Sequence, residues 1–503
     1  MRSTLAMLGV ISISVTMLLA PIATTAAEAA EVDAKKYDNW HHWRGPNFDG
    51  TSPNAKPPLE WSADKNVKWK VPVPGEGQST PIIWENKIFL LSAVPSPKNE
   101  GTGSPDSGNA GNGNAGNGGN DERQFMVLEP DPQQGQGQGR RGGGPRGQRG
   151  RRGGGRGSAP TTPFDYTVFC FDKNNGEELW KQVAITAVPH EGKHSTSSFA
   201  SMSPTTDGER LYASFGSRGV FCYTLDGKLL WQTDLGDMKV RASFGEGGAP
   251  VVHGDSLVHI WDHEGQSALF CLDAKTGEQR WKVDRDERTT WQTPLVTMYG
   301  GKTQVICNGS NRTRAYDLKD GSIIWECGGQ VQNPIPSPVR MGDTVYCMSG
   351  YQGFAITAIP LSATGDVTDK DKMLWSRSDS APYVASPLLY DGKLYFNKNR
   401  NAFFSCIDAK TGEVHYGEQR LPEISNIYAS IAGADGKVFV IGRNGKTLVL
   451  APGAEYKVLA VNDLGEGIDA SPAMVGNEIF LRTTGHLWCI AEGASGTGAK
   501  QSG

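Results

Sequence analysis

Histidine and acidic side chains lie close together at two places in this sequence of 503 residues. Such side chains bind zinc and act as general acids and bases. His190 and His194 are four residues apart, a spacing that brings two ligands together only on a helix. Their segment, PHEGKHSTS, contains glycine and is expected to form a loop. We therefore expect ordinary histidines here, and a metal site only if two loops meet. The second group, with the same expectation, consists of His253, His259, His263 and Asp262.

Motifs of nucleophilic, redox and phosphate chemistry are absent from the sequence. It contains no GxSxG, HExxH or CxxC, and the glycines of FGEGGAP lack the strand-to-helix context of a phosphate-binding loop. The neighbours His41 and His42 would point apart on a strand, and the nearest carboxylate is Asp38. Packing of Trp40 and Trp43 against the protein body is the expected role of this segment. No catalytic, cofactor-binding or metal-binding residue is predicted.

The scaffold for these residues is a repeated unit of an apolar strand, a tight turn with Asp and Gly, and a second strand that ends on an aromatic residue. LFCLDAKTGEQRW, residues 269–281, is the clearest copy. Copies recur with a period in the forties, which is typical of repeat architectures. Asp-Gly and Gly-Asn pairs within the units predict tight hairpins. Each unit is therefore expected to form four short antiparallel strands. Further copies start at Val168, Val220, Thr313 and Phe404.

Eight strand-pair openings can be counted, the first at Ser79 and the last at Ala470. From Pro204 onwards the corresponding residues are 41 to 49 positions apart. NVKWKVPVP, residues 66–74, looks like a final strand without its first three, and residues 470–493 supply three strands without a fourth. Pairing them would remove exposed sheet edges. We predict an all-β fold, an eight-bladed β-propeller of four-stranded antiparallel blades spanning residues 66–493. The N-terminal strand is predicted to complete the C-terminal blade and close the ring.

Aromatic and cysteine residues recur at fixed places in this unit. The aromatics are expected to fill the space between neighbouring blades. Five cysteines occupy one repeated site, and equivalent sites in adjacent blades should be about 10 Å apart, too far for a disulfide. These five are Cys170, Cys222, Cys271, Cys406 and Cys489. A bridge among Cys307, Cys327 and Cys347 stays open. The predicted inter-blade aromatics are Trp69, Trp180, Trp231, Trp281, Trp325, Trp375 and Tyr416.

Segments outside the repeats predict the cellular location of the protein. Residues 1–29 read as a signal peptide, with a positive start, an apolar run and a small-residue cleavage site, so we expect a secreted or periplasmic protein. The first cysteine is Cys170, so no lipid-anchoring cysteine follows the signal. Residues 30–65 are expected to form an N-terminal extension and residues 494–503 a flexible tail.

A Gly-, Asn- and Arg-rich insertion, residues 95–164, is predicted to be disordered within the first blade because it offers little apolar surface to bury. Residues 131–160 hold seven Arg and one Asp, whereas the whole chain has a formal charge of −4. The rest of the chain is therefore acidic. Nucleic acid is not an expected partner, except through this Arg-rich insertion.

The strand–xD–xxTGxxxW repeat resembles the pyrroloquinoline-quinone (PQQ) type propeller repeat of quinoprotein dehydrogenases and of the BamB family of outer-membrane assembly factors. A closer likeness is to exported PQQ-like propellers of planctomycetes and related bacteria. It spans Trp40 to Glu492 apart from the insertion. The motifs that carry it are WRGP (43–46), NVKWKVPVPG (66–75), APYVASPLLYDGKLYF (381–396) and VLAVNDLGEGIDASPA (458–473).

The resemblance implies a binding or scaffold module of the cell envelope, BamB-like and without a cofactor, whose partners are envelope proteins, peptides or glycans. In a propeller, the residues just before each innermost strand surround the mouth of the central channel. The mixture of aromatic and acidic residues there suits contact with a peptide or a carbohydrate. The channel-mouth candidates are Gln78, Glu246, Trp291, Asn333, Tyr383, Tyr428 and Asp469.

The alternative that the resemblance implies is a dehydrogenase that oxidises alcohols or sugars with PQQ and calcium. Such enzymes hold calcium with carboxylate and amide oxygens and use an Asp as base. Many also carry two adjacent cysteines on the cofactor, and this sequence has no Cys-Cys pair. We therefore expect no enzymatic activity from the motifs.

Overall fold

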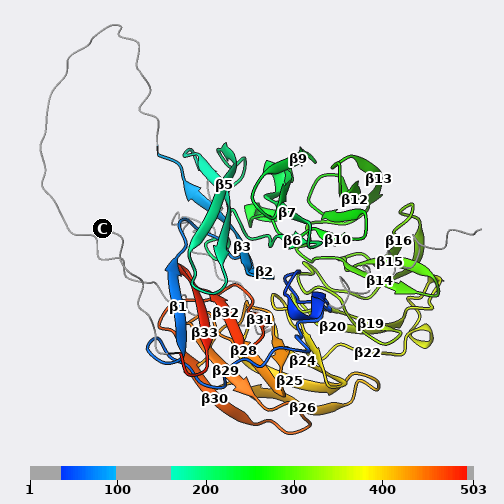
Figure 1. Ribbon diagram of the computed structural model, residues 1–503. Coiled ribbons are helices and arrows are strands. Elements are labelled where there is room, and N and C mark those ends of the chain that lie inside the picture. The colour runs from blue at the N-terminus through cyan, green and yellow to red at the C-terminus, as the bar shows by residue number, and fades with distance from the viewer. Residues whose placement is uncertain (1–34, 98–159, 495–503) are drawn as a thin grey trace, which may run out of the picture. The chain divides into compact units, whose positions relative to one another are not determined.

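The computed structural model describes residues 35–97 and 160–494; the predictions for the signal peptide, the tail and nearly all of the insertion lie outside them. All described strands belong to the unit formed by Met1–Ser96 and Arg156–Gly503. They form eight sheets, seven of four strands and one of five, in a propeller arrangement (Figure 1). The prediction of an all-β, eight-bladed propeller is confirmed.

Blades 1 to 4 follow one another along the chain. Blade 1 contains β2 (Ile82–Trp84), β3 (Lys87–Pro95), β4 (Phe164–Asp172) and β5 (Glu178–Ala187). Blade 2 contains β6 (Thr205–Thr206), β7 (Arg210–Ser214), β8 (Val220–Thr224) and β9 (Leu229–Thr233). Blade 3 contains β10 (Val251–His253), β11 (Ser256–Trp261), β12 (Ser267–Asp273) and β13 (Gln279–Arg285). Blade 4 contains β14 (Leu295–Tyr299), β15 (Lys302–Cys307), β16 (Thr313–Asp317) and β17 (Ile323–Cys327), and gains β21 (Gly365–Asp366).

Blades 5 to 8 complete the ring. Blade 5 contains β18 (Val339–Met341), β19 (Thr344–Ser349), β20 (Ala355–Pro360) and β22 (Trp375–Arg377). Blade 6 contains β23 (Leu388–Tyr390), β24 (Lys393–Asn397), β25 (Phe403–Asp408) and β26 (Val414–Arg420). Blade 7 contains β27 (Ala432–Ala434), β28 (Lys437–Ile441), β29 (Lys446–Leu450) and β30 (Val458–Asp463). Blade 8 contains β31 (Ala473–Val475), β32 (Glu478–Arg482), β33 (His486–Ala491) and β1 (Val67–Pro72). The described helices are the short 3-10 turns η1 (Lys36–Asp38), η2 (Gly216–Arg218), η3 (Arg241–Ser243) and η4 (Lys370–Lys372).

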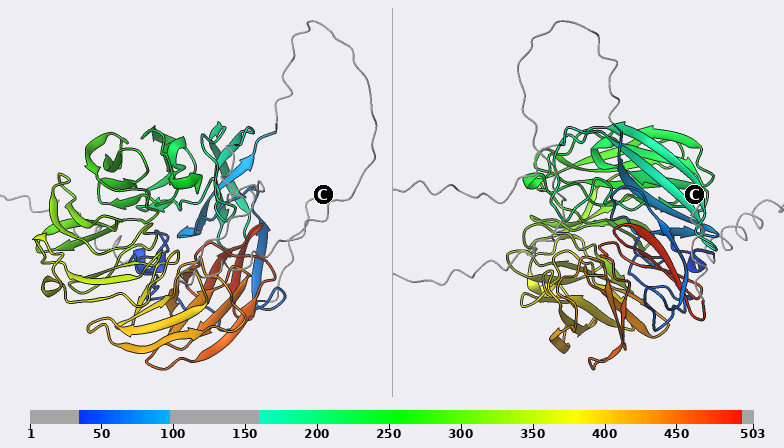
Figure 2. Two further views of the ribbon diagram at one scale, coloured as in Figure 1. Left: turned by 180° about the vertical axis from the view of Figure 1, so that it is seen from behind. Right: turned by 90° about the vertical axis from the view of Figure 1, so that its left-hand side faces the viewer.

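The ring is closed as predicted, by an N-terminal strand in the last blade. Strand β1 pairs antiparallel with β33, with Trp69 opposite Cys489 and Lys70 opposite Trp488. Strand β2 of blade 1 contacts β31 of blade 8, so the first and last blades are neighbours. Both views of the ribbon show β1 beside the C-terminal strands (Figures 1 and 2).

The turn chemistry read from the repeats is present. Asp391 and Gly392 have φ of 50° and 70°, and Asp435 and Gly436 have 49° and 65°, the positive values that a tight hairpin with a primed turn requires. Gly277, in the longer DAKTG turn, has φ of 75°. Its backbone therefore lies in the left-handed region, where glycine is favoured.

The repeated tryptophan joins each blade to the next. The Trp231 indole N–H donates to the Ala274 carbonyl in blade 3 at 3.1 Å. A Cβ on Gly277 would lie 2.5 Å from the Trp231 ring, so this turn must be glycine for packing as well as for its φ. In the TGxxxW motif, each turn glycine therefore packs against the tryptophan of the preceding blade, and the tryptophan of the motif packs against the turn of the next blade. The same kind of bond joins Trp69 to Lys173, Trp180 to Leu225, Trp281 to Leu318, and Trp375 to Ala409.

Trp325 departs from this pattern because blade 5 lacks the DxxTG turn. Its indole is fully buried and donates to the Gln304 side chain at 3.1 Å, and Gln304 in turn donates to the Leu361 carbonyl at 2.8 Å. The added strand β21 pairs with β17 beside it. A side-chain amide thus bridges the two blades. The last aromatic, Tyr416, is also buried and meets Tyr456 of blade 7 edge-on at 5.8 Å.

All eight cysteines lie in the described residues, and all are buried and free. The five at the repeated site pack as small buried groups, and no bridge forms among Cys307, Cys327 and Cys347. Burial raises the pKa of the Cys170 thiol to about 12.

The boundaries of the insertion need a small correction. Strands β3 and β4 stay paired as far as Pro95 and Phe164, so both end residues of the predicted 95–164 segment belong to blade 1. On β3, Ala93 also exchanges two backbone hydrogen bonds with Glu76. No helix in residues 35–97 and 160–494 is long and apolar enough to cross a bilayer.

Candidate functional site

The two faces of the propeller carry different kinds of connection. Because strands alternate in direction within a blade, the two hairpin turns of each blade lie on one face. The loops between the second and third strands and between successive blades lie on the other. We call these the turn face and the loop face. The central cavity described below is lined almost entirely from the loop face.

The N-terminal segment, residues 40–52, crosses the middle of the turn face, and we call it the floor segment (Figure 1). Its Trp40 exchanges two backbone hydrogen bonds of 2.9 Å with Ile83 in blade 1. At its other end Ser52 donates to the Gly433 carbonyl in blade 7 at 3.1 Å. On one side of the segment Trp43 lines the central cavity, and on the other side residues 46–49 line a second cavity among the turns. The floor segment therefore separates the two cavities.

Arg44 fastens the floor segment to the ring. The side chain is 2% exposed, and its guanidinium donates to the carbonyls of Ile431 at 2.8 Å, Pro387 at 2.5 Å and Asp49 at 2.9 Å. Burial lowers the pKa of Arg44 to about 10, and the nearby Asp49 carboxylate acts in the opposite direction. Three carbonyls from two blades and the segment itself thus share one buried cation.

On the loop face the central cavity has a volume of about 340 Å³. The structure brings six of the seven channel-mouth candidates together around it. The seventh, Asn333, is 3% exposed and lies outside the lining, where its side chain accepts a bond from Arg241 at 3.2 Å. The six that line the cavity are Gln78, Glu246, Trp291, Tyr383, Tyr428 and Asp469.

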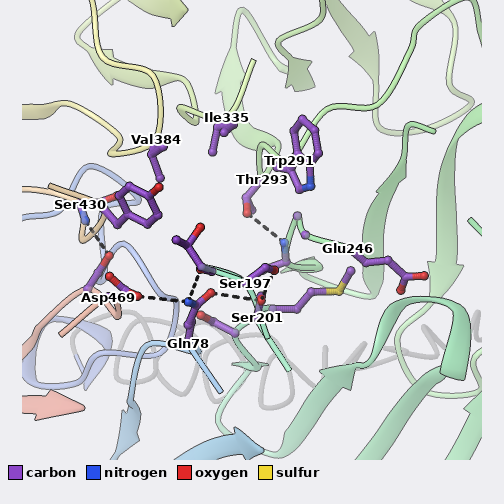
Figure 3. A pocket seen from close by; sticks show the side chains of 18 of the residues that line it. Gln78, Ser197, Ser201, Glu246, Trp291, Thr293, Ile335, Val384, Ser430 and Asp469 are labelled. Atoms are coloured by element: carbon purple, nitrogen blue, oxygen red, sulfur yellow. Dashed lines mark hydrogen bonds between the residues drawn. The ribbon is translucent and has the colours of Figure 1, made fainter. Parts of the chain in front are cut away.

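Asp469 is neutralised by an arginine that the sequence reading did not find. Arg443 donates to both Asp469 oxygens, at 2.6 and 2.9 Å, and its guanidinium lies 4.2 Å from the Tyr428 ring centre. Gln78 adds a third bond to Asp469 at 3.3 Å, and Figure 3 shows these two side chains directed at each other. Donation of these hydrogen bonds to the Asp469 carboxylate raises the pKa of Arg443.

Glu246 is also engaged within the protein. Its carboxylate accepts the Ser217 N–H at 2.8 Å and the Ser217 hydroxyl at 2.5 Å, and in Figure 3 it points away from the cavity. Burial raises the pKa of Glu246, against the opposing effect of those hydrogen bonds. Glu246 thus fixes the loop after blade 2, with its carboxylate directed away from the cavity.

Cationic side chains, in contrast, are available. Arg400, on the loop between β24 and β25, lines the cavity and is exposed. Within the described part of the chain no carboxylate lies within ion-pair distance of it. His194 also lines the cavity, and its pKa is lowered, first by burial and then by Arg400, Arg443 and Lys193. Arg400 is therefore the cation that the described lining residues offer to a ligand.

Aromatic and apolar groups form part of the wall. Tyr351 and Tyr383 stack with ring centres 4.8 Å apart. Trp291 is half-buried and held by a 2.7 Å bond from its indole to the Gly245 carbonyl. Ile335 and Val384 come from the neighbouring loops before blades 5 and 6 (Figure 3). These rings and aliphatic groups can cover apolar parts of a ligand.

A ring of hydroxyls surrounds the channel at the start of the innermost strands. In most blades a Ser or Thr precedes the strand-opening proline, and its hydroxyl accepts the N–H of the equivalent residue one blade earlier. The sequence reading noticed the prolines and missed the hydroxyls, although the Ser-Pro and Thr-Pro pairs would have identified them. Within the described residues the ring is interrupted at two places, at Ala249 and between Ser471 and Thr80. The bonds, all 2.9 or 3.0 Å, join Thr80 to Ser203, Ala249 to Thr293, Thr293 to Ser337, Ser337 to Ser386, Ser386 to Ser430, and Ser430 to Ser471.

The comparisons with known proteins decide the family. The sequence profile described as "Outer membrane protein assembly factor BamB" matches residues 165–418, just over half of the chain. The chain belongs to this family. No curated protein sequence matches it.

Solved structures similar to this BamB-family chain share its fold. BamB from Moraxella catarrhalis is 12% identical, with a TM-score of 0.47, over 65% of this chain and 89% of that one. The quinohemoprotein alcohol dehydrogenase of Comamonas testosteroni is 9% identical, with a TM-score of 0.53, over 93% of this chain and 84% of that one. The quinohemoprotein alcohol dehydrogenase ADHIIG of Pseudomonas putida HK5 is 9% identical, with a TM-score of 0.55, over 94% and 82%. At these identities the likeness to the two dehydrogenases shows the propeller fold alone.

The histidines singled out from the sequence of this BamB-family chain do not converge. His190 bonds to the Met238 carbonyl at 2.7 Å, and the fully buried His259 to the Ser214 hydroxyl at 2.8 Å. Asp262 forms a buried ion pair with Arg285 at 2.7 Å. No group of three or more His, Cys, Asp or Glu side chains in the described residues is placed to hold a metal.

The cavity residues do not fit a calcium-bound quinone. Calcium needs six to eight oxygen ligands, several of them carboxylates. The two carboxylates in the lining are engaged, Asp469 with Arg443 and Glu246 with Ser217. The geometry therefore supports binding of a ligand that accepts hydrogen bonds, and we derive no redox step.

Proposed function

We propose that this protein is a non-catalytic binding or scaffold module of the cell envelope, which holds a protein partner at the mouth of its central cavity. One observation carries this proposal: side chains from the loops of all eight blades gather around a cavity whose other end is covered by the floor segment. Rigid loop platforms of this kind are suited to recognition. Membership of the BamB family supports a role in the envelope, and the predicted signal peptide at residues 1–29 fits with it.

The internal pairing of the lining carboxylates also favours binding over catalysis. A general base must be able to accept a proton from the substrate. Asp469 is held by Arg443 and Gln78, and Glu246 by Ser217. Neither side chain is free to act as the Asp base of the dehydrogenase alternative.

Site-specific photo-crosslinking tests the proposal. A benzophenone amino acid replaces Tyr428 at the mouth or, as the matched control, the exposed Met298 on the turn face. After irradiation in envelope extract, crosslinked proteins are identified, purified and titrated against the unmodified chain. We expect a partner that crosslinks at 428, does not crosslink at 298, and binds directly. Equal crosslinking at both positions, or no direct binding, would reject the proposal.

The dehydrogenase alternative has its own measurement. Purified protein is mixed with PQQ and calcium, and dye-linked oxidation of alcohols and sugars is followed together with the quinone absorption spectrum. We expect neither turnover nor a spectral shift. Turnover that disappears on calcium removal would replace the binding proposal with an enzyme.

A further inference from the structure

The hydroxyls of the ring have unused protons that face the central cavity. A Ser or Thr hydroxyl can donate one hydrogen bond and accept two. Thr293, Ser430 and Ser471 each accept a backbone N–H from a neighbouring blade, and none donates to an acceptor within residues 35–97 or 160–494. All three side chains are nearly buried, at 4%, 3% and 7% exposure, and all line the cavity. Their protons are therefore available to a ligand.

The lining offers unused donors, and its two carboxylates are engaged within the protein. Arg400 adds a guanidinium without a carboxylate partner among the described residues. Asp469 and Glu246 already accept three and two hydrogen bonds within the protein. A sugar hydroxyl also donates, and the two lining carboxylates that could accept from it are engaged within the protein. A carboxylate, which only accepts, matches the donor set.

The floor segment restricts which part of a chain can enter. Trp43 of the floor segment lines the central cavity, and residues 46–49 of the same segment line the second cavity among the turns. Because the segment lies between the two cavities, a ligand chain cannot pass through the ring. A chain end fits such a one-ended cavity, and the middle of a chain does not. The stacked pair Tyr351 and Tyr383, together with Ile335, can cover an apolar side chain next to that end.

We infer that the central cavity binds the C-terminal carboxylate of an extended peptide whose last residues are apolar, with Arg400 and the ring hydroxyls as donors. Capture of a peptide terminus by convergent donors is a known mode of recognition. The inference rests on the proposed binding function and names the part of the partner that is recognised. Arg400 then acts as the ion-pair partner, and Thr293, Ser430 and Ser471 as neutral donors.

The test is a cycle of two peptides and two proteins. Fluorescein-labelled hexapeptides that end in leucine or phenylalanine are titrated, by anisotropy, with a free carboxylate or with a C-terminal amide. The full chain is compared with Arg400→Gln and with the matched control Arg420→Gln, on the outer strand β26 of the same blade. We expect the wild type and the control to bind the free acid at least ~10-fold more tightly than the amide. In Arg400→Gln this preference should fall to about threefold or less.

A second pair of variants examines the ring without relying on charge. Thr293→Val keeps the shape and removes the hydroxyl, whereas Thr293→Ser keeps the hydroxyl. We expect Thr293→Val to lose several-fold of the preference for the free acid and Thr293→Ser to retain it. Thermal unfolding of each variant, measured alongside, identifies samples that are not folded.

Three results would overturn the inference. Equal binding of acid and amide by the wild type would reject carboxylate recognition, while a partner crosslinked at position 428 would still support the proposed function. No peptide binding at all would reject a peptide terminus as the ligand. Binding of an oligogalacturonate that is lost in Arg400→Gln, without peptide binding, would assign the cavity to an acidic glycan instead.

Discussion

The floor and the mouth of the central cavity each contain an arginine, and the two arginines differ in burial and in bonding partners. At the floor, Arg44 is buried and donates to three backbone carbonyls. At the mouth, Arg400 is exposed and has no ion-pair partner in the described residues. Donors at the floor are used to hold the fold together, whereas donors at the mouth stay available. The difference indicates that one end is structural and the other is where a ligand binds.

The tryptophans at the two ends give the largest expected contrast. Trp40 is 1% exposed in the floor, and Trp291 is half-buried at the mouth. Trp40→Ala should lower the free energy of unfolding by about 4 kcal/mol, because it leaves a large cavity. Trp291→Ala should cost about 1 kcal/mol and weaken peptide binding severalfold. Urea unfolding and anisotropy measure the two effects; equal destabilisation by both would remove the distinction.

The two arginines give the next contrast. Arg44→Met removes three hydrogen bonds and leaves buried carbonyls unpaired, so the free energy of unfolding should fall by about 3 kcal/mol. Arg400→Met should change it by less than about 0.5 kcal/mol, because the side chain is exposed. Urea unfolding at pH 7 provides both values. A loss below about 1 kcal/mol for Arg44→Met would show that the floor segment is not fastened as described.

Acid should destabilise the folded state through His42 in the floor segment. His42 is 2% exposed, and burial, then His41 and Arg44, hold its pKa well below its usual range. An unfolded histidine takes up a proton near pH 6.5, so the unfolded state binds more protons than the folded state as the pH falls below that value. Between pH 7 and pH 5 this should cost the folded state about 2 kcal/mol.

His42→Gln serves as the test of this pH effect, because glutamine does not titrate. The difference in unfolding free energy between pH 7 and pH 5 should shrink by about 2 kcal/mol relative to the wild type. The matched variant His194→Gln, at the exposed mouth, should change it much less. An unchanged difference in His42→Gln would mean that His42 is not buried in its neutral form.

The interruption of the hydroxyl ring at Ala249 allows a prediction of increased stability. Ala249 occupies the position at which other blades place Ser or Thr, so no hydroxyl is present to accept the Ser203 N–H. Ala249→Ser should raise the free energy of unfolding by about 1 kcal/mol. Thermal and urea unfolding measure the gain. Ala249→Gly is the control and should destabilise the protein; a loss with serine as well would contradict the ring as a source of stability.

Much of the fold could be predicted because it repeats. The number of blades could be predicted from the TGxxxW copies and the eight strand openings. The incomplete ends of the chain predicted that the strand containing Trp69 closes the ring. The residues of the mouth could be predicted only from their place in the repeat, just before each innermost strand. Six candidates do line the cavity, but Asn333 is buried and Glu246 points away from it, because side-chain direction depends on how each loop folds.

Arg400, Arg443 and the floor segment could not be read from the sequence in the same way. Arg400 lies on a loop between the second and third strands of its blade. The channel-mouth candidates, in contrast, were the residues just before the innermost strand of each blade. Arg443 reaches Asp469 from the neighbouring blade, and Arg44 reaches carbonyls more than 300 positions away in the sequence. These contacts exist only after the ring has closed.

Hydrogen exchange with and without the free-carboxylate peptide tests most directly the claim that the mouth binds and the floor does not. Slower exchange is expected in the loop segments 380–385, 398–402 and 465–470, with no change in residues 40–52 or in the outer strands β5 and β26. Protection of the floor segment or of the outer strands, or an unchanged mouth, would contradict the account.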